Sequence, residues 1–355
     1  MIVGELLRSH AAVLERGGRS RLYVGLMRGA ADDADAGGIV DAIFAGDPLT
    51  PESVPQLRLL AALHHLVLGG GAPELAPFYP SAGGGEPPQG AWAVARQTLA
   101  DNAAFIRERV GHTVQTNEPG RCVALYGGLL WLSERHRLPL RLLEIGASAG
   151  LHLNADRFAY VVGGATLGDP SSPLSFSEPW DGLPVADPLA AAARLQIAAR
   201  AGCDKSPIDP TSEDGRLTLQ SYIWPDETDR LERVAQAAQV AAAHPVLVEA
   251  RSAALWLAAR LADTKPDMLT VVWQSCVNQY LDDAERAAIR SAFASAGAAP
   301  LAWLTLEPAA TPDGSDTFEL RCRERPEANG SSGEAPVIAR AGYHGPPVVW
   351  RVPGT

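Results

Sequence analysis

The segment 142–151 constrains the fold of this chain more than any other. It reads Leu-Leu-Glu-Ile-Gly-Ala-Ser-Ala-Gly-Leu: an apolar run that opens at Leu140, then small residues, then a helical pattern. This order is typical of a β-strand, a tight turn and a helix N-terminus. Glycine permits positive φ and close approach of a ligand to the backbone, and the free N–H groups at a helix start attract anions. The segment therefore predicts an α/β protein with a ligand site at the end of its first strand.

Two chemistries fit this turn. Read as Glu144-x-Gly146-x-Ser148-x-Gly150, it resembles the first motif of S-adenosylmethionine (SAM) methyltransferases. The small residues would let the methionine part of SAM approach the backbone, and Glu144 would lie near its amino group. Ser148 stands where that motif usually has its middle glycine, which adds a Cβ and a hydroxyl beside the cofactor. Read as Gly146-x-Ser148-x-Gly150, the same turn matches the nucleophile elbow of α/β-hydrolases.

Composition excludes several function classes. The 355 residues are 46% hydrophobic, enough for a large core, and carry a formal net charge of -11. An acidic surface repels phosphate backbones, so no nucleic-acid partner is expected. The four cysteines lack CxxC spacing and are expected to be reduced thiols in a cytoplasmic protein. Glu5 and Arg8 interrupt any signal-peptide core, no apolar run spans a membrane, and no metal-ligand spacing occurs.

The pattern of apolar residues along the chain changes near residue 138. Before it, apolar residues recur at helical spacing over 1–16, 56–68, 91–110 and 121–135. After it, short apolar runs alternate with helical stretches, which favours a parallel sheet covered on both faces. The expected strands are 140–145, 195–199, 245–248, 269–273 and 301–306, followed by an antiparallel meander of 318–323, 337–341 and 348–352. The expected helices between them are 149–158, 229–243, 251–262 and 282–296, with an insertion over 160–190.

Two acids suit the rest of a nucleoside cofactor. Asp204 follows the second expected strand, where methyltransferases carry a ribose acid, and Asp209 is the fallback. Glu249 follows the third strand, at the place of the adenine partner, although a carboxylate at a helix start is also favoured by the dipole alone.

The fourth strand runs into a polar segment that could face a methyl acceptor. Gln274, Ser275 and Tyr280 are its candidates for acceptor contacts. His152, four residues after Ser148, is a candidate general base because histidine titrates near neutral pH, but an ordinary surface role is the simpler expectation. The link 115–121 between two helices could cap the pocket. Its simpler interpretation is a helix N-cap made by Asn117.

A serine hydrolase is the first alternative. Ser148 would be the nucleophile, with Asp316 or Asp313 as the acid and His344 as the base, in the chain order of α/β-hydrolases. Two features oppose it. Helices precede the turn where a hydrolase has strands, and Glu144 would be a buried charge in a core strand. The second alternative is a non-catalytic scaffold that binds a nucleoside-like ligand or a protein.

The chain resembles the uncharacterised bacterial family known as domain of unknown function 2332. The motifs that carry the resemblance are Gln-Thr-Asn-Glu-Pro-Gly-Arg at 115–121, the segment 142–153, Gly-Asp-Pro at 168–170, Trp-Pro-Asp at 224–226 and the segment 274–281. The resemblance implies an architecture rather than a reaction, with a methyltransferase-like C-terminal part. We therefore expect a helical domain over 1–138 and a Rossmann-like, mostly parallel α/β domain over 139–355. SAM is the expected cofactor and a small molecule the expected acceptor.

Overall fold

The computed structural model describes residues 2–50, 53–309, 317–325 and 334–351. Contacts divide the chain into two compact units, Met1–Thr116 with Ser212–Ala235, and Asn117–Thr211 with Gln236–Thr355. The helices of the first unit are α1 Ile2–Arg16, α2 Arg21–Asp35, α3 Ile39–Ile43, α4 Pro55–Leu68, α5 Ala91–Asp101, α6 Ala103–Val110 and α9 Glu213–Ser221. Helix α10, Thr228–Ala243, spans the point at which the chain passes from the first unit to the second.

The core of the first unit forms around α4. This helix is apolar on nearly every side, and most of its residues are buried, as expected for a helix enclosed by others. It matches the predicted helix 56–68, whereas the predicted helix 91–110 is divided into α5 and α6 at Asn102, whose φ of -115° and ψ of 24° are not helical. Trp224 from the later segment packs against the same core.

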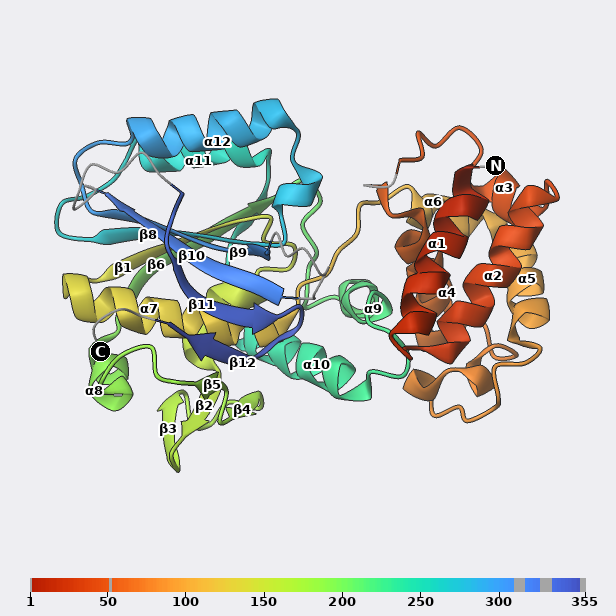
Figure 1. The fold of residues 1–355 in the computed structure, drawn as a ribbon, viewed down its shortest axis with the longest axis horizontal. Helices are drawn as coiled ribbons and strands as arrows, with labels where there is room; N and C mark the ends of the chain where they lie inside the picture. The colour runs from red at the N-terminus through yellow and green to blue at the C-terminus, as the bar shows by residue number, and fades with distance from the viewer. Residues whose placement is uncertain (1, 51–52, 310–316, 326–333, 352–355) are drawn as a thin grey trace. The chain divides into compact units, whose positions relative to one another are not determined.

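The second unit contains a nine-stranded sheet (Figure 1). Its strands are β1 Leu140–Ile145, β5 Trp180–Asp181, β6 Ile197–Asp204, β7 Val248–Ala250, β8 Leu269–Ser275, β9 Leu301–Pro308, β10 Thr317–Arg325, β11 Val337–Gly342 and β12 Gly345–Trp350. The order across the sheet is β5-β12-β11-β10-β9-β8-β1-β6-β7. The five strands from β9 to β7 are mutually parallel, and β9 to β12 form an antiparallel meander.

Each strand that the sequence predicts overlaps an observed one, and the expected mostly parallel sheet and antiparallel meander are both present. β6 ends five residues later than expected, at Asp204, and β7, expected over 245–248, is observed at Val248–Ala250. Pro245 has no N–H to donate to a strand ladder, so the strand begins later.

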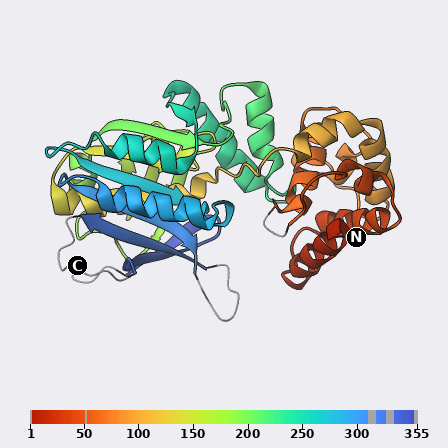
Figure 2. The same ribbon diagram turned by 90° about the horizontal axis from the view of Figure 1, so that it is seen from above.

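Helices cover both faces of this sheet. α11 Ala253–Leu261 and α12 Asp283–Ser295 lie on one face, side by side when seen from above, and α7 Cys122–His136 lies on the other (Figures 1 and 2). Side chains alternate between faces along a strand. Leu143 and Ile145 of β1 therefore join the core under α11 and α12, and Glu144 points to the face of α7.

The expected insertion over 160–190 builds a small sheet of its own. Its strands are β2 Ala159–Val162, β3 Ala165–Gly168 and β4 Ser175–Ser177, and α8 Pro188–Arg194 follows. Tyr160 stacks on Tyr126 of α7, with ring centroids 4.2 Å apart, and Trp180 donates a hydrogen bond to the carbonyl of Val123. The insertion is thus joined to α7 through aromatic rings.

The contact units differ from the expected boundary at 138. Helix α7 groups with the sheet because its backbone lies close against it: a Cβ added to Gly127 would lie 2.1 Å from the ring of Trp350. Segment 212–235 groups with the helical unit because α9 packs on α4. A single change in the pattern of apolar residues does not reveal that segment 212–235 returns to the first unit.

Gly127→Ala should therefore destabilise the protein by about 1–3 kcal/mol, since the new methyl overlaps the Trp350 ring. Gly25 lies in the exposed middle of α2 with nothing within 4 Å of an added Cβ, so Gly25→Ala should be stabilising by about 0.5–1 kcal/mol. Urea unfolding of both variants tests this. Equal effects of the two substitutions would contradict the packing of α7 on the sheet.

Candidate functional site

The turn after β1 is a compact backbone loop with left-handed residues. Gly146, Ser148 and Gly150 have φ of 68°, 50° and 71°. A Cβ added to Gly146 would lie 2.4 Å from the Val277 side chain, and one added to Gly150 would lie 2.8 Å from Val246. Both glycines are thus required by close packing within the protein. The helix expected over 149–158 is a 3-10 helix, η5 Leu151–Arg157, with non-helical dihedrals at Asn154.

Asp204 holds this turn from the neighbouring strand. It is the last residue of β6, which pairs with β1, and its Oδ2 accepts a hydrogen bond from the Ser148 N–H at 2.9 Å. Its Oδ1 accepts one from the Ser206 N–H. The predicted ribose acid therefore lies beside the turn. Asp209, the fallback, accepts hydrogen bonds from Thr211 in a loop of its own.

Glu249 is an ion-pair residue in β7. Its Oε1 accepts a hydrogen bond from the indole N–H of Trp256, 2.6 Å away, and pairs with Arg260. These contacts hold its pKa below the usual value. The carboxylate is thus fixed to α11 through Oε1, and its Oε2 lies 4.0 Å from Arg251 Nη1.

Glu144 and His152 form a buried pair on the α7 face. His152 Nδ1 lies 2.8 Å from Glu144 Oε1, and the side chains are 3% and 1% exposed. His152 Nε2 lies 2.9 Å from the carbonyl oxygen of Glu118. Because a carbonyl only accepts, Nε2 carries a proton. The expectation of a surface role for His152 is wrong: the 3-10 turn directs its ring inward, against Trp273.

Burial raises the pKa of Glu144, and the neighbouring His152 opposes that rise. The carboxyl Oε2 of Glu144 is buried and has no hydrogen-bond partner. Both ring nitrogens of His152 are occupied, so its ring is fixed in place rather than poised to abstract a proton. Oε1 of Glu144 is engaged by His152, so Oε2 is the atom of this carboxyl group that a cofactor could contact.

The link before α7 is tied to the turn rather than capping a helix through Asn117. Asn117 Oδ1 accepts a hydrogen bond from the Leu151 N–H at 2.9 Å. The cap residue of the short helix η4 Pro119–Arg121 is Glu118, whose carboxylate accepts from the Gly120 N–H. The predicted Asn117 N-cap is therefore wrong. Asn117 bonds a residue 34 positions later in the chain, and such a long-range hydrogen bond has no pattern in the local sequence.

Arg121 is a buried cation at the start of α7. It is 1% exposed, and its guanidinium donates to the Tyr343 carbonyl and, at 3.4 Å, to the hydroxyl of Ser275. Its Nη2 is buried without a partner. Burial lowers its pKa, but electrostatic interactions with Cys276, Tyr343, Glu118 and Glu307 together raise the pKa above the usual value. Sequence reasoning did not find Arg121 as a site residue, although it closes the 115–121 motif.

The ends of β8 and β9 supply the remaining polar groups. Gln274 Nε2 donates to Asn278 Oδ1 at 2.6 Å and to Glu307 Oε1 at 2.8 Å. Glu307 Oε1 also accepts the N–H groups of Val277 and Asn278. Of the three expected acceptor residues, Gln274 and Ser275 are buried at the end of β8, and Tyr280 is 38% exposed in η6 Asn278–Tyr280. The sequence analysis did not identify Glu307, although an acidic residue near the end of an apolar strand could have indicated it.

Four buried polar atoms at this edge of the sheet have no hydrogen-bond partner. They are Arg121 Nη2, Glu144 Oε2, Gln274 Oε1 and Glu307 Oε2. A buried polar atom without a partner costs about 1–3 kcal/mol, more when charged. Their concentration at the carboxyl ends of β1, β8 and β9 is typical of a site that a polar ligand or water completes.

The hydrolase residues are only partly described. Asp313 and Asp316 lie outside the described residues. His344 Nδ1 lies 3.6 Å from Glu118 Oε2, and Ser148 contributes its backbone N–H to Asp204. All four cysteines are buried free thiols. In the described part of the chain, no group of three His, Cys, Asp or Glu side chains could hold a metal ion, and no helix is long and apolar enough to span a membrane.

Glu144→Gln tests how much the ionisation of Glu144 affects stability, because glutamine has nearly the same shape and no charge. Glutamine keeps the hydrogen bond to His152 and cannot ionise. A carboxyl whose folded pKa is raised contributes stability fully below its unfolded pKa of 4.5, and this stability is lost as the pH rises through the folded value. The free energy of unfolding of Glu144→Gln relative to wild type should therefore increase with pH above 4.5, by about 1.4 kcal/mol per unit of pKa difference.

Urea unfolding at several pH values measures this difference. Glu144→Ala is the second variant, expected to be less stable than Glu144→Gln by about 3 kcal/mol at all pH values, because neither side chain ionises and alanine leaves a cavity and loses the hydrogen bond to His152. A difference between Glu144→Gln and wild type that does not change with pH would contradict the raised pKa.

Comparison with known proteins gives a family and no named activity. No curated protein and no solved structure matches the chain. A family model does match, over residues 5–350, and its description is "Uncharacterized protein conserved in bacteria". The match spans nearly the whole chain, including the turn after β1, Arg121 and Glu307. The protein thus belongs to the bacterial family DUF2332, domain of unknown function 2332.

Proposed function

We propose that the sheet-bearing unit is a Rossmann-like domain that binds SAM and transfers its methyl group to a small molecule. The strand order supports this. In chain order, β1, β6, β7, β8 and β9 are the first to fifth parallel strands, and they lie in the order 3-2-1-4-5. That is the order of doubly wound nucleotide-binding sheets, in which ligands bind outside the carboxyl ends at the point where the order reverses. Here that point is between β1 and β8.

The observation that carries the proposal is the set of unpartnered atoms at that point. Arg121 Nη2 is a cationic donor, and Glu144 Oε2 and Glu307 Oε2 are carboxylate acceptors. Arg121 interacts electrostatically with both acids. A buried guanidinium near buried carboxylates suits an amino-acid zwitterion, with its carboxylate on Arg121 and its ammonium on the acids. The methionine half of SAM has this chemistry, and Gly146, Ser148 and Gly150 would line its path.

Asp204 would hold the ribose. A carboxylate can accept about four hydrogen bonds, and the two N–H groups that it receives from the turn fix its orientation. Both oxygens of Glu249 already pair with arginines, Oε1 with Arg260 and Oε2 with Arg251, so its expected role at the adenine edge is the weaker part of the cofactor assignment. Val277 packs against Gly146 and occupies the space where a side chain at this position would lie.

The chemistry would consist mainly of positioning. When bound, SAM supplies a methyl group on a positively charged sulfur. The chain's own part is to align an acceptor with that methyl, an effect that can supply several kcal/mol of the barrier. Gln274 and Ser275 would orient the acceptor from the end of β8. His152 would act as a positioning residue for Glu144, since both its nitrogens are engaged.

Calorimetric titration with SAM and with S-adenosylhomocysteine tests the proposal. The wild-type protein should bind at micromolar concentration. Asp204→Asn should weaken binding about tenfold, since hydrogen bonds to a charged group contribute roughly 1.5–3 kcal/mol. Asp209→Asn is the matched control, another acid in a turn of the same connection, and should leave affinity unchanged. No binding at millimolar ligand would contradict the proposal and leave the hydrolase and the non-catalytic scaffold as the alternatives.

Ser148→Gly separates methyl transfer from hydrolysis. Ser148 has a positive φ, as a strained nucleophile elbow requires, and this favours the hydrolase as the second candidate. Glycine adopts φ of 50° without the strain of a side chain. In a SAM-binding turn, Ser148→Gly should retain or tighten S-adenosylhomocysteine binding. In a hydrolase, the wild type should react with a fluorophosphonate probe and Ser148→Gly should not. Labelling of the wild type at Ser148 would therefore contradict the methyltransferase proposal.

A further inference from the structure

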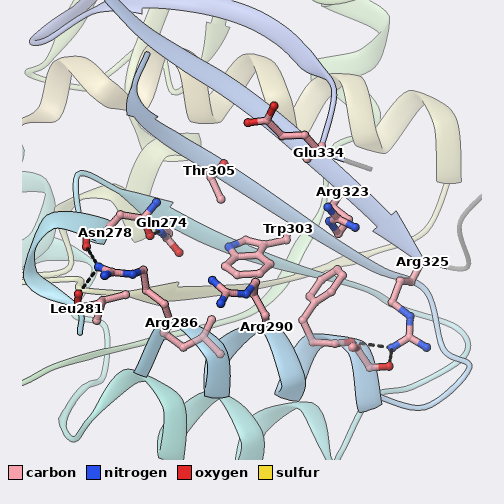
Figure 3. A pocket seen from close by; sticks show the side chains of 14 residues that line it. Gln274, Asn278, Leu281, Arg286, Arg290, Trp303, Thr305, Arg323, Arg325 and Glu334 are labelled. Atoms are coloured by element: carbon pink, nitrogen blue, oxygen red, sulfur yellow. Dashed lines mark hydrogen bonds between the residues drawn. The ribbon is translucent and has the colours of Figure 1, made fainter. Parts of the chain in front are cut away.

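A basic groove lies beside α12, on the face of the sheet opposite to α7. Its volume is about 700 Å³. α12 forms one wall, the strands β9 and β10 form the floor, and Gln274 and Asn278 from the end of β8 close one end (Figure 3).

Four arginines line this groove in a protein of net charge -11. Two of them are fixed at its ends by backbone carbonyls. Arg286 donates to the carbonyls of Asn278 and Leu281, and Arg325 donates to those of Phe293, Ala294 and Ala296 at the end of α12. The other two, Arg290 and Arg323, flank the indole of Trp303 in the view of Figure 3.

The secondary structure directs these cations to one place. Arg286 and Arg290 are four residues apart on α12 and therefore share a face, where two like charges cost about 0.2–0.5 kcal/mol. Arg323 of β10 lies opposite Trp303 of β9 in the ladder, so both side chains project from the same face of the sheet. Trp303 contacts Phe293 of α12, with centroids 5.4 Å apart, so that face is the one under α12. The fold thus holds like charges together at a cost.

Three acids near the groove have arginine or lysine partners among the described residues. Asp283 pairs with Arg286. Glu285 and Glu334 pair with Lys205 and Arg321, which are not among the four arginines of the groove. Among the residues that the structure describes, Arg290 has no ion pair, and its side chain is exposed on α12. Arg325 bonds only to carbonyl oxygens in the contacts given above, which satisfy its N–H groups without neutralising its charge. The described lining thus carries four arginines and one acid, Glu334, and has a net positive charge.

Two buried polar atoms in its lining also lack partners. Gln274 is 1% exposed, and its Oε1 has no hydrogen bond; the indole N–H of Trp303 is likewise unpartnered. The Trp303 and Phe293 rings give the groove an apolar wall between the arginines. The lining therefore offers cations, an indole donor and aromatic surface together.

We propose that this groove binds a small organic anion, with a phosphate or carboxylate group between Arg290 and Arg323 and an aromatic or apolar body against Trp303. Arginine suits both acidic groups because its planar guanidinium bonds two oxygens at once. The inference depends on the groove alone and not on SAM binding.

Calorimetry with 1-naphthyl phosphate and 1-naphthoate as probes tests the groove. The wild type should bind both, the phosphate more tightly because it carries more charge, and should not bind neutral 1-naphthol. Arg290→Gln and Arg323→Gln should each weaken binding of the phosphate about tenfold, and Arg290→Lys should weaken it less. Arg137→Gln, an exposed cation at the end of α7, is the control and should bind as the wild type does.

Two results would overturn the proposal. One is failure of the wild type to bind either anionic probe at millimolar concentration. The other is phosphate binding that neither Arg290→Gln nor Arg323→Gln weakens, in variants whose thermal unfolding shows that they remain folded. Because neither probe resembles SAM, titration with S-adenosylhomocysteine in the same variants keeps the two proposals separate.

Discussion

The buried contact between Glu144 and His152 is the interaction on which this edge of the sheet depends. It joins the central strand β1 to the 3-10 helix η5, and the second nitrogen of the same ring joins both to the link before α7 through the Glu118 carbonyl. Three segments far apart in sequence are thereby fixed around one imidazole. Removing one partner from such a pair is costly because the other is left buried and unpaired. The position of Arg121, three residues after Glu118, follows from this link.

The alternation of side chains along the strands divides the chemistry between two faces. Glu144 and Trp273 point to α7, whereas Gln274 and Trp303 lie on the face of α12. Charged groups on the α7 face are enclosed by the turn, η5 and the link before α7. On the α12 face they border a groove. The carboxyl ends of the strands are where the two sets meet, since Arg121 interacts with Glu307 across the end of β8.

Much of the fold and part of the site follow from local sequence pattern. Strands such as β1 and β8 are continuous apolar runs, and Asp204 could be located after the second expected strand, although β6 continues as far as Asp204 itself. His152 could not, because a histidine after a glycine turn is assigned to a regular helix, whereas η5 is a 3-10 helix that turns its ring inward. Arg121, Arg290 and Arg323 could not be assigned to sites from the sequence, because tertiary contacts bring them to their neighbours. Only the β9–β10 register brings Arg323 beside Trp303.

Gln274 links the two proposed sites physically. Its side chain lines one end of the basic groove, and its amide nitrogen bonds Glu307, whose other oxygen is unpartnered at the carboxyl end of β9. A ligand in the groove that satisfies Gln274 Oε1 would contact the residue that lies opposite Ile145, the last residue of β1, in the β1–β8 ladder. A methyl acceptor with an acidic group would meet both requirements: its charge would lie among the arginines, and its reactive atom would extend toward the turn. Under the two proposals, the groove would select the acceptor by charge and the turn would position the methyl donor.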